Sequence, residues 1–374
     1  MHQLVPPHIE KLQPYRAGKP IAEVQQEYGL ERVVKLASNE NPLGPSPLAA
    51  AAASRALSEL HRYPDPNALK LRWALATRFR LSIDNVIVGN GSEGIMAGIV
   101  RVFLQGDDEV ITSDAAFLGF PILCRTRGVE PITVPLKEYR FDLDALADRI
   151  TARTRLIYLC NPNNPTGTIF TRDEFDRFMA RVPRRVLVIQ DEAYHEFASH
   201  HADYPDSMDY RYDNVITLRT FSKAYGLAGL RVGYGFGHDH LIGSLWKVKL
   251  PFEPSAMAQA AGVAALGDYE FLDRTLALTR QGLEFYYREL PRLGLRYLPS
   301  RANFVMVLTD SPEEVQRIFG EMLRKGVIVR PLEQAGLPHC VRITVGTPEE
   351  NQICVDALEA VLRARKTAPR QDPS

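Results

Sequence analysis

The chain has 374 residues, a length that allows about two domains. Its 45 basic and 45 acidic residues give a formal net charge of zero. The sequence therefore lacks the basic excess typical of proteins that bind nucleic acids or anionic membranes, and we expect a small-molecule partner. Hydrophobic residues at 45% and charged residues at 24% are ordinary for a globular protein and exclude gross disorder.

The cellular location is also predicted from composition. The first 19 residues contain no apolar core segment, and no stretch elsewhere reaches the ~18 apolar residues of a membrane span, so neither a signal peptide nor a membrane anchor is expected. The four cysteines are scattered and make a poor disulfide framework. We therefore expect a cytoplasmic protein.

The N-terminal part is expected to be an arm. Pro42, Pro45 and Pro47 precede an Ala-rich helix predicted over residues 48–57. Residues 1–44 are therefore predicted to form an N-terminal arm and hinge, and the large domain is predicted to begin at residue 45.

The segment from Asp84 to Gly237 has an alternating pattern of short apolar runs and stretches of helical period. Helices are predicted over residues 142–150 and 171–181, the second with a capping box formed by Thr171 and Glu174. Strands are predicted at residues 86–88, 109–112, 132–135, 156–160, 186–189, 215–218 and 232–236. Because these strands are apolar on both faces, we predict an α/β fold with a mostly parallel sheet covered by helices, in a large domain spanning residues 45–267.

The pattern changes after Gly267. A long helix is predicted over residues 268–290, ended by Pro291 and Gly294, and a helix over 312–325 and a final helix over 348–363 follow. Strands are expected at residues 304–308 and near Val327 and Val341. Residues 268–374 are therefore predicted to form a smaller α+β domain, together with the N-terminal arm.

The residues that follow the predicted strands carry the chemistry, because ligands of open parallel sheets bind beyond the carboxyl ends of the strands. A Gly-rich turn at residues 89–94 opens a helix and suits a phosphate group. The other turns supply an amide, a carboxylate, a phenol, two hydroxyls and two cations: Asn164, Asp191, Tyr194, Thr220, Ser222, Lys223 and Arg231. Pyridoxal phosphate needs all of these: an amine for its aldehyde, a carboxylate for its ring nitrogen, donors to its phenolate oxygen and an anion site.

Two other features of the sequence could indicate a different ligand, a dinucleotide or a metal ion. Gly89, Gly91 and Gly94 spell the dinucleotide-binding pattern, and Asp114 lies at about the expected 20 residues beyond, so an NAD-dependent dehydrogenase is an alternative. A dehydrogenase would not require the amide, the carboxylate and the lysine that follow the other predicted strands. The histidines at residues 200–201 and 238–240 are assigned to polar connecting segments that lack a complete ligand set, and no metal is expected.

Three motifs identify a resemblance: residues 161–167 (NPNNPTG), 191–194 (DEAY) and 222–231 (SKAYGLAGLR). In these motifs, and from about Leu12 to Leu362, the chain resembles the fold-type-I pyridoxal-phosphate-dependent aminotransferases, and most of all the histidinol-phosphate aminotransferases. The resemblance implies that Lys223 forms a Schiff base with the cofactor and moves a proton, and that Asp191 pairs with the ring nitrogen. Asn164 and Tyr194 would bind the phenolate oxygen.

The resemblance also implies the remaining cofactor contacts. The phosphate would be bound by Gly91, Ser92, Glu93, Thr220, Ser222 and Arg231. Phe117 would stack on the ring. Tyr63 would reach the phosphate from a neighbouring subunit, so a homodimer with a shared active site is expected.

Substrate residues are implied in the same way. Arg342 would clamp a substrate carboxylate with its planar guanidinium, Arg330 and Tyr15 would surround the far end of the substrate, and Asn39 would close over the site. The expected substrates are histidinol phosphate as amino donor and 2-oxoglutarate as the 2-oxo acid acceptor. Glu253 stands where the family usually has Asn, and a carboxylate near the opening would repel a phosphorylated substrate. An aromatic or other amino-acid aminotransferase, and a decarboxylase or carbon–sulfur lyase on the same scaffold, are therefore alternatives.

Overall fold

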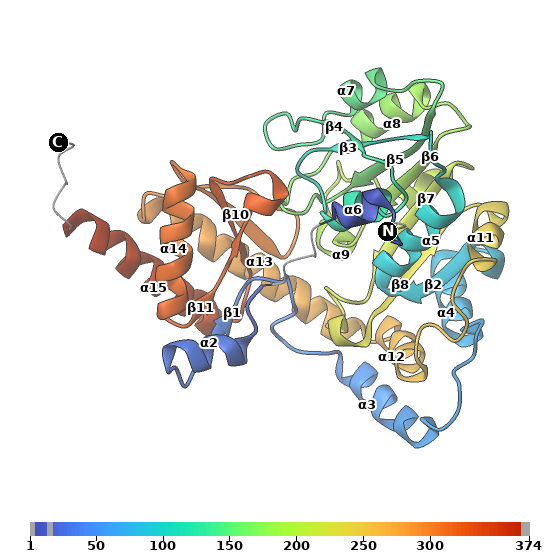
Figure 1. Cartoon of the computed structure of the whole chain (residues 1–374). Coiled ribbons are helices and arrows are strands. Elements are labelled where there is room, and N and C mark those ends of the chain that lie inside the picture. Colours follow the sequence, from blue (N-terminus) through green and yellow to red (C-terminus); the bar gives the residue numbers. More distant parts are fainter. Residues whose placement is uncertain (1–3, 13–17, 368–374) are drawn as a thin grey trace.

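The computed structural model describes residues 4–12 and 18–367. A seven-stranded sheet forms the centre of the large unit (Figure 1), with strand order β2-β8-β7-β6-β5-β3-β4. The strands are β2 (Val86–Asn90), β3 (Glu109–Ser113), β4 (Ile132–Val134), β5 (Thr154–Cys160), β6 (Leu187–Asp191), β7 (Val215–Thr220) and β8 (Val232–Phe236). Neighbours from β4 to β7 are parallel, and β8 is antiparallel to both β7 and β2. The predicted α/β class with a mostly parallel sheet is confirmed.

Helices cover both faces of this sheet, because each face carries its own apolar cluster. On one face pack α5 (Gly91–Phe103), α6 (Gly119–Arg125), α7 (Leu143–Asp148), α8 (Arg172–Arg181) and α11 (Asp239–Trp246). On the other pack α3 (Pro47–Ala56), α4 (Leu69–Phe79) and α12 (Ala256–Leu266). The capping box predicted for residues 171–181 is present at the start of α8, where Thr171 and Glu174 bind each other's backbone N–H.

The strand before the Gly-rich turn lies at the edge of the sheet. Its only neighbour in the described sheet is β8, which runs antiparallel to it. The dinucleotide fingerprint requires a parallel βαβ unit in which the following strand is close by, whereas here the chain crosses to β3 on the far side of β5. The glycine pattern at residues 89–94 is therefore not a dinucleotide fingerprint.

A second, smaller sheet lies beside the first (Figure 1) and has the antiparallel order β12-β13-β10-β9. Its strands are β9 (Arg296–Leu298), β10 (Phe304–Leu308), β12 (Arg330–Pro331) and β13 (Cys340–Thr344), and it packs against α13 (Tyr269–Arg292), α14 (Pro312–Arg324) and α15 (Pro348–Thr367). From the arm, β1 (Val34–Lys35) pairs in parallel with β11 (Val327–Ile328), which joins the arm to this unit. The helix ends at Arg292, between the predicted stop signals Pro291 and Gly294: Pro291 lies inside the last turn of α13, and Gly294 follows its C-cap Leu293.

The remaining described helices are short: α1 (Pro7–Glu10), α2 (Ile21–Tyr28), α9 (His195–Ala198) and α10 (Ser207–Tyr210), with 3-10 turns at Leu57–Glu59, Ile83–Asn85, Ala228–Leu230 and Glu333–Ala335. Among the described residues, none of the helices combines the length and apolar character needed to cross a membrane.

Candidate active site

The carboxyl ends of β5, β6 and β7 surround one cavity of about 150 Å³. Ten residues predicted to bind the cofactor line it: Ser92, Glu93, Phe117, Asn164, Asp191, Tyr194, Thr220, Ser222, Lys223 and Arg231. They come from separate turns of the sequence, and the parallel sheet brings these turns to one edge. The convergence predicted from the strand ends is therefore present in the structure.

Lys223 follows β7 and lines this cavity. The side chain is half-buried, and its Nζ donates a hydrogen bond to the carbonyl oxygen of Ser38 at 3.1 Å. Burial, and then the positive charge of Arg342, lowers the pKa of Lys223 to about 8. A larger share of neutral amine is therefore present near neutral pH than in an ordinary lysine, which is what nucleophilic attack on a carbonyl carbon requires.

Asp191 is the last residue of β6 and is 3% exposed. Its Oδ2 accepts a hydrogen bond from the hydroxyl of Tyr158 at 2.7 Å, and its Oδ1 accepts one from the N–H of Ala193 at 3.1 Å. Burial raises the pKa of Asp191 to about 6. Within the described residues, no Lys, Arg or His nitrogen lies within ion-pair distance of this carboxylate. A buried carboxylate with only neutral donors suits a cationic ligand.

An anion site lies at the start of α5. The N-cap Asn90 makes no side-chain cap, which leaves the first N–H groups of α5 to a ligand. Gly91 has a φ of 75°, and a Cβ there would lie 2.7 Å from Nη2 of Arg231, so only glycine allows the guanidinium to approach the helix start. Nη1 of Arg231 donates to Oγ of Ser222 at 3.4 Å, and Ser222 also accepts from Thr220 at 3.0 Å. The cation, two hydroxyls and helix N-terminus match a phosphate group.

A second cavity of about 350 Å³ adjoins the first and shares Phe117, Asn164, Tyr194 and Lys223 with it. The predicted substrate residues Asn39, Arg330 and Arg342 all line this cavity. None of its described lining residues is an Asp or Glu, whereas two lysines and two arginines contribute. The second cavity therefore suits an anionic substrate.

Hydrogen bonds connect the two cavities. Nδ2 of Asn39 donates to the hydroxyl of Tyr194 at 2.8 Å, and Oδ1 of Asn39 accepts from Thr344 of β13 at 3.0 Å. Arg342 donates to Oδ1 of Asn164 and to the carbonyl oxygen of Ala37. These bonds tie the arm and the small sheet to the turns after β5 and β6, so residues of all three parts form one site.

Two residues considered in the sequence analysis lie outside these two cavities, and a third is not among the described residues. Tyr63 lines neither cavity of its own chain; it is 80% exposed and stacks on Phe252, with ring centroids 4.3 Å apart. Glu253 lines a different pocket beside α5, so within the chain its carboxylate is not at the opening where we expected it. Tyr15 lies outside the described residues.

A buried ion pair behind the site was missed by sequence reasoning. Arg219 on β7 is 1% exposed, and its Nη2 lies 2.7 Å from both Oε2 of Glu192 and Oδ1 of Asp206. Glu192 directly follows Asp191, and Arg219 lies four residues before Lys223. Because the guanidinium already pairs these carboxylates, the group that Glu192 and Asp206 form with His195 is explained without a metal ion.

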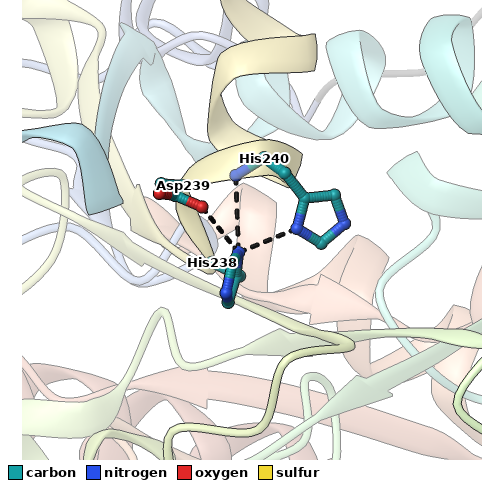
Figure 2. A group of neighbouring side chains, drawn as sticks. All are labelled: His238, Asp239 and His240. Carbon is teal, nitrogen blue, oxygen red and sulfur yellow. Dashed lines mark hydrogen bonds and ion pairs between the residues drawn. The ribbon is translucent and has the colours of Figure 1, made fainter.

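Figure 2 shows the second histidine group, His238, Asp239 and His240, which are all exposed. Nδ1 of His238 lies 2.8 Å from Nδ1 of His240 and 2.7 Å from Oδ1 of Asp239. The assignment to a connecting segment is wrong for His240, which lies in the first turn of α11, whereas His238 directly precedes the helix as its N-cap and accepts the N–H of His240. The cap uses the Nδ1 lone pair of His238, and the positive end of the helix opposes a cation.

Comparison with known proteins agrees with this geometry. The family model described as aminotransferase class I and II matches residues 31–358, so the chain belongs to this family and is an aminotransferase. Histidinol-phosphate aminotransferase 2 of Carboxydothermus hydrogenoformans is 43% identical over 357 residues, which cover 95% of this chain and 98% of the relative. Histidinol-phosphate aminotransferase of Anaeromyxobacter sp. is 44% identical over 368 residues, 96% of this chain and all of the relative.

A solved structure shows the same fold. The histidinol-phosphate aminotransferase of Sinorhizobium meliloti, in complex with pyridoxal-5'-phosphate, superimposes with a TM-score of 0.90 at 29% identity, covering 98% of this chain and 99% of that one. Pyridoxal phosphate is the cofactor of this family, and the cavity fits it on three observations above. Asp191 is a buried carboxylate without a cation, Lys223 is a lysine with a lowered pKa, and the start of α5 offers an anion cradle that a Cβ at residue 91 would fill.

Proposed function

We propose that this chain, with pyridoxal phosphate bound in the first cavity, transfers the amino group of histidinol phosphate to 2-oxoglutarate. The observation that carries the choice of substrates is the second cavity, whose charged lining residues are Lys35, Lys223, Arg330 and Arg342. Both proposed substrates are anionic: the donor carries a phosphate ester and the acceptor carries two carboxylates. Guanidinium groups bind both kinds of oxyanion in bidentate geometry.

Gly91 and the residues of the first cavity that were predicted to bind the cofactor have proposed roles. When bound, the cofactor supplies an aldehyde carbon and an electron sink. Lys223 would bind the aldehyde carbon through its amine, and the free amine would take the proton from the donor's Cα. Asp191 keeps the ring nitrogen protonated, Asn164 and Tyr194 orient the phenolate oxygen, and Phe117 stacks on the ring. Gly91, Ser92, Glu93, Thr220, Ser222 and Arg231 hold the phosphate.

A donor panel tests the proposed substrates. Purified protein with 2-oxoglutarate is given histidinol phosphate, histidinol, phenylalanine or tyrosine, and glutamate formation is measured. Because two charge-assisted hydrogen bonds to phosphate are lost with histidinol, we expect its kcat/KM to be lower by about 10²-fold or more. A higher kcat/KM for an aromatic donor would favour the aromatic aminotransferase alternative, and release of carbon dioxide or of a thiol would favour a decarboxylase or lyase.

The domain boundaries and the cellular location of the protein are also proposed. We place the N-terminal arm at residues 1–44, the large domain at 45–267 and the small domain at 268–374, because α13 begins at Tyr269 and belongs to the small unit's apolar cluster through its C-terminal half. All four cysteines are unpaired, which suits the reducing cytoplasm.

We also propose a homodimer with a shared active site. An apolar surface, which we call the α3–α4 surface, carries exposed large side chains in and around these helices: Leu57, Leu60, Tyr63, Trp73 and Phe252. Leu57, Leu60 and Tyr63 are close together in the chain and Tyr63 stacks on Phe252, and exposed apolar clusters of this kind are typical of an interaction site. A second copy of the chain on this surface would bring Tyr63 toward the anion cradle of its partner, which accounts for the distance of Tyr63 from the cavities of its own chain.

A charge on this surface is expected to break the dimer. Leu60→Asp should elute as a monomer in size-exclusion chromatography, because a carboxylate cannot be buried without a partner. Its affinity for pyridoxal phosphate should fall by about tenfold, as expected for one lost hydrogen bond to a charged group. The matched control is Ile21→Asp, which changes an exposed apolar side chain on α2 outside this surface. A dimeric Leu60→Asp protein, or a monomer with unchanged cofactor affinity, would argue against the shared site.

A further inference from the structure

Tyr158 is the residue that fixes the carboxylate of Asp191. It lies in β5, where it pairs in register with Ile189 of β6. Asp191 is two residues beyond Ile189 and therefore projects from the same face of the sheet. The phenol ring therefore reaches diagonally from β5 to the end of β6, and its hydroxyl donates to Oδ2 of Asp191 at 2.7 Å.

The ring of Tyr158 is itself held in place. It is fully buried and stacks on Phe120 of α6, with ring centroids 4.3 Å apart and an angle of 13° between the planes. Tyr158 lines neither of the two cavities of the site. It is thus in contact with the carboxylate but not with a ligand of the first cavity, and any effect on the reaction must pass through Asp191.

We propose that Tyr158 is a positioning residue that keeps Asp191 ionised and turned toward the ring nitrogen of the cofactor; this rests on the proposed function. With Oδ2 bound to Tyr158 and Oδ1 to the N–H of Ala193, rotation of the carboxylate costs both bonds. A hydrogen bond from a neutral donor favours the charged form of a buried carboxylate without neutralising it, so the charge stays available to the ring nitrogen.

Other titratable groups also face Asp191. They are Glu93 of α5, Cys160 of β5, Tyr194 after β6 and Lys223 after β7. All four stay unchanged in the variants used below. A shift of the pH profile between those variants therefore reports on the bond between Tyr158 and Asp191.

The test compares Tyr158→Phe with Tyr234→Phe. Tyr234 on β8 is equally buried, and among the described residues its hydroxyl has no hydrogen-bond partner. The dissociation constant of pyridoxal phosphate from each apo-protein is titrated over a pH range on both sides of the Asp191 pKa. We expect it to rise by about tenfold in Tyr158→Phe, with the acidic loss of affinity moved to higher pH, and to be unchanged in Tyr234→Phe. Tyr158→Phe retains the ring that stacks on Phe120, and its melting temperature checks that it is folded.

A double-variant cycle separates positioning from packing. In the Asp191→Asn background, Tyr158→Phe should have no further effect on the dissociation constant, because the charge it supports is gone. The proposal is overturned if Tyr158→Phe binds like the native protein, or if it weakens binding equally in both backgrounds. If Asp191→Asn alone leaves the dissociation constant and its pH dependence unchanged, the role of Asp191 in the proposed function fails as well, which distinguishes the two failures.

Discussion

Lys223→Ala is expected to lose transamination by at least about 10⁴-fold while the protein stays folded. In the proposed mechanism the same amine acts as nucleophile and as proton carrier, so no other side chain of the cavity would replace it. The folded state loses little, because within the described residues Nζ of Lys223 makes a single hydrogen bond, to the carbonyl oxygen of Ser38. Glutamate formation and the visible absorbance of the bound cofactor measure the loss, and thermal unfolding measures the fold.

The matched control is Lys325→Ala, an exposed lysine at the end of α14. It should keep native activity and absorbance. Since the pKa of Lys223 is about 8, the neutral amine predominates above that pH. The rate at which native apo-protein attaches the cofactor should therefore rise up to about pH 8 and then level off. Residual turnover of Lys223→Ala near the native rate would remove Lys223 from the mechanism.

Asp191→Asn is expected to lower kcat by about 10²-fold or more, because the ring nitrogen loses its charged partner in a water-poor site. Stability should change little or improve, since the described structure gives this buried carboxylate no cation to neutralise it. Circular dichroism and single-turnover kinetics separate the two effects.

The dependence of cofactor affinity on pH also tests the role of the Asp191 charge. The pKa of Asp191 is about 6 in the protein, so lowering the pH through that value protonates the carboxylate. Cofactor affinity of the native protein should fall there, whereas that of Asp191→Asn should stay level. Parallel losses of stability and activity in Asp191→Asn would instead identify Asp191 as a structural residue.

The sequence predicts those parts of the fold and of the site that depend on local residue patterns. Apolar runs with turns between them locate the seven strands of the large sheet, and Lys223 and Asp191 are placed at one edge because parallel strands end together. The antiparallel direction of β8 and the edge position of β2 depend on long-range pairing, which no local pattern encodes.

The features that the sequence did not predict are mainly side-chain contacts between neighbouring strands that are far apart along the chain. In the sequence, Tyr158 is indistinguishable from the other apolar positions of a buried strand. Only the register between β5 and β6 places its hydroxyl next to Asp191. Arg219 and Glu192 are 27 residues apart, and their pairing depends on the register between β6 and β7 in the same way. The proposed role of Tyr63 depends on a second subunit, which the sequence of one chain does not place.

The most direct test of the central claim is to find the lysine that binds the cofactor. Native protein loaded with pyridoxal phosphate is reduced with borohydride, digested and analysed by mass spectrometry. We predict one phosphopyridoxyl group, on the peptide that contains Lys223, and none in Lys223→Ala. A modification on another lysine such as Lys35, with Lys223 unmodified, would contradict the account.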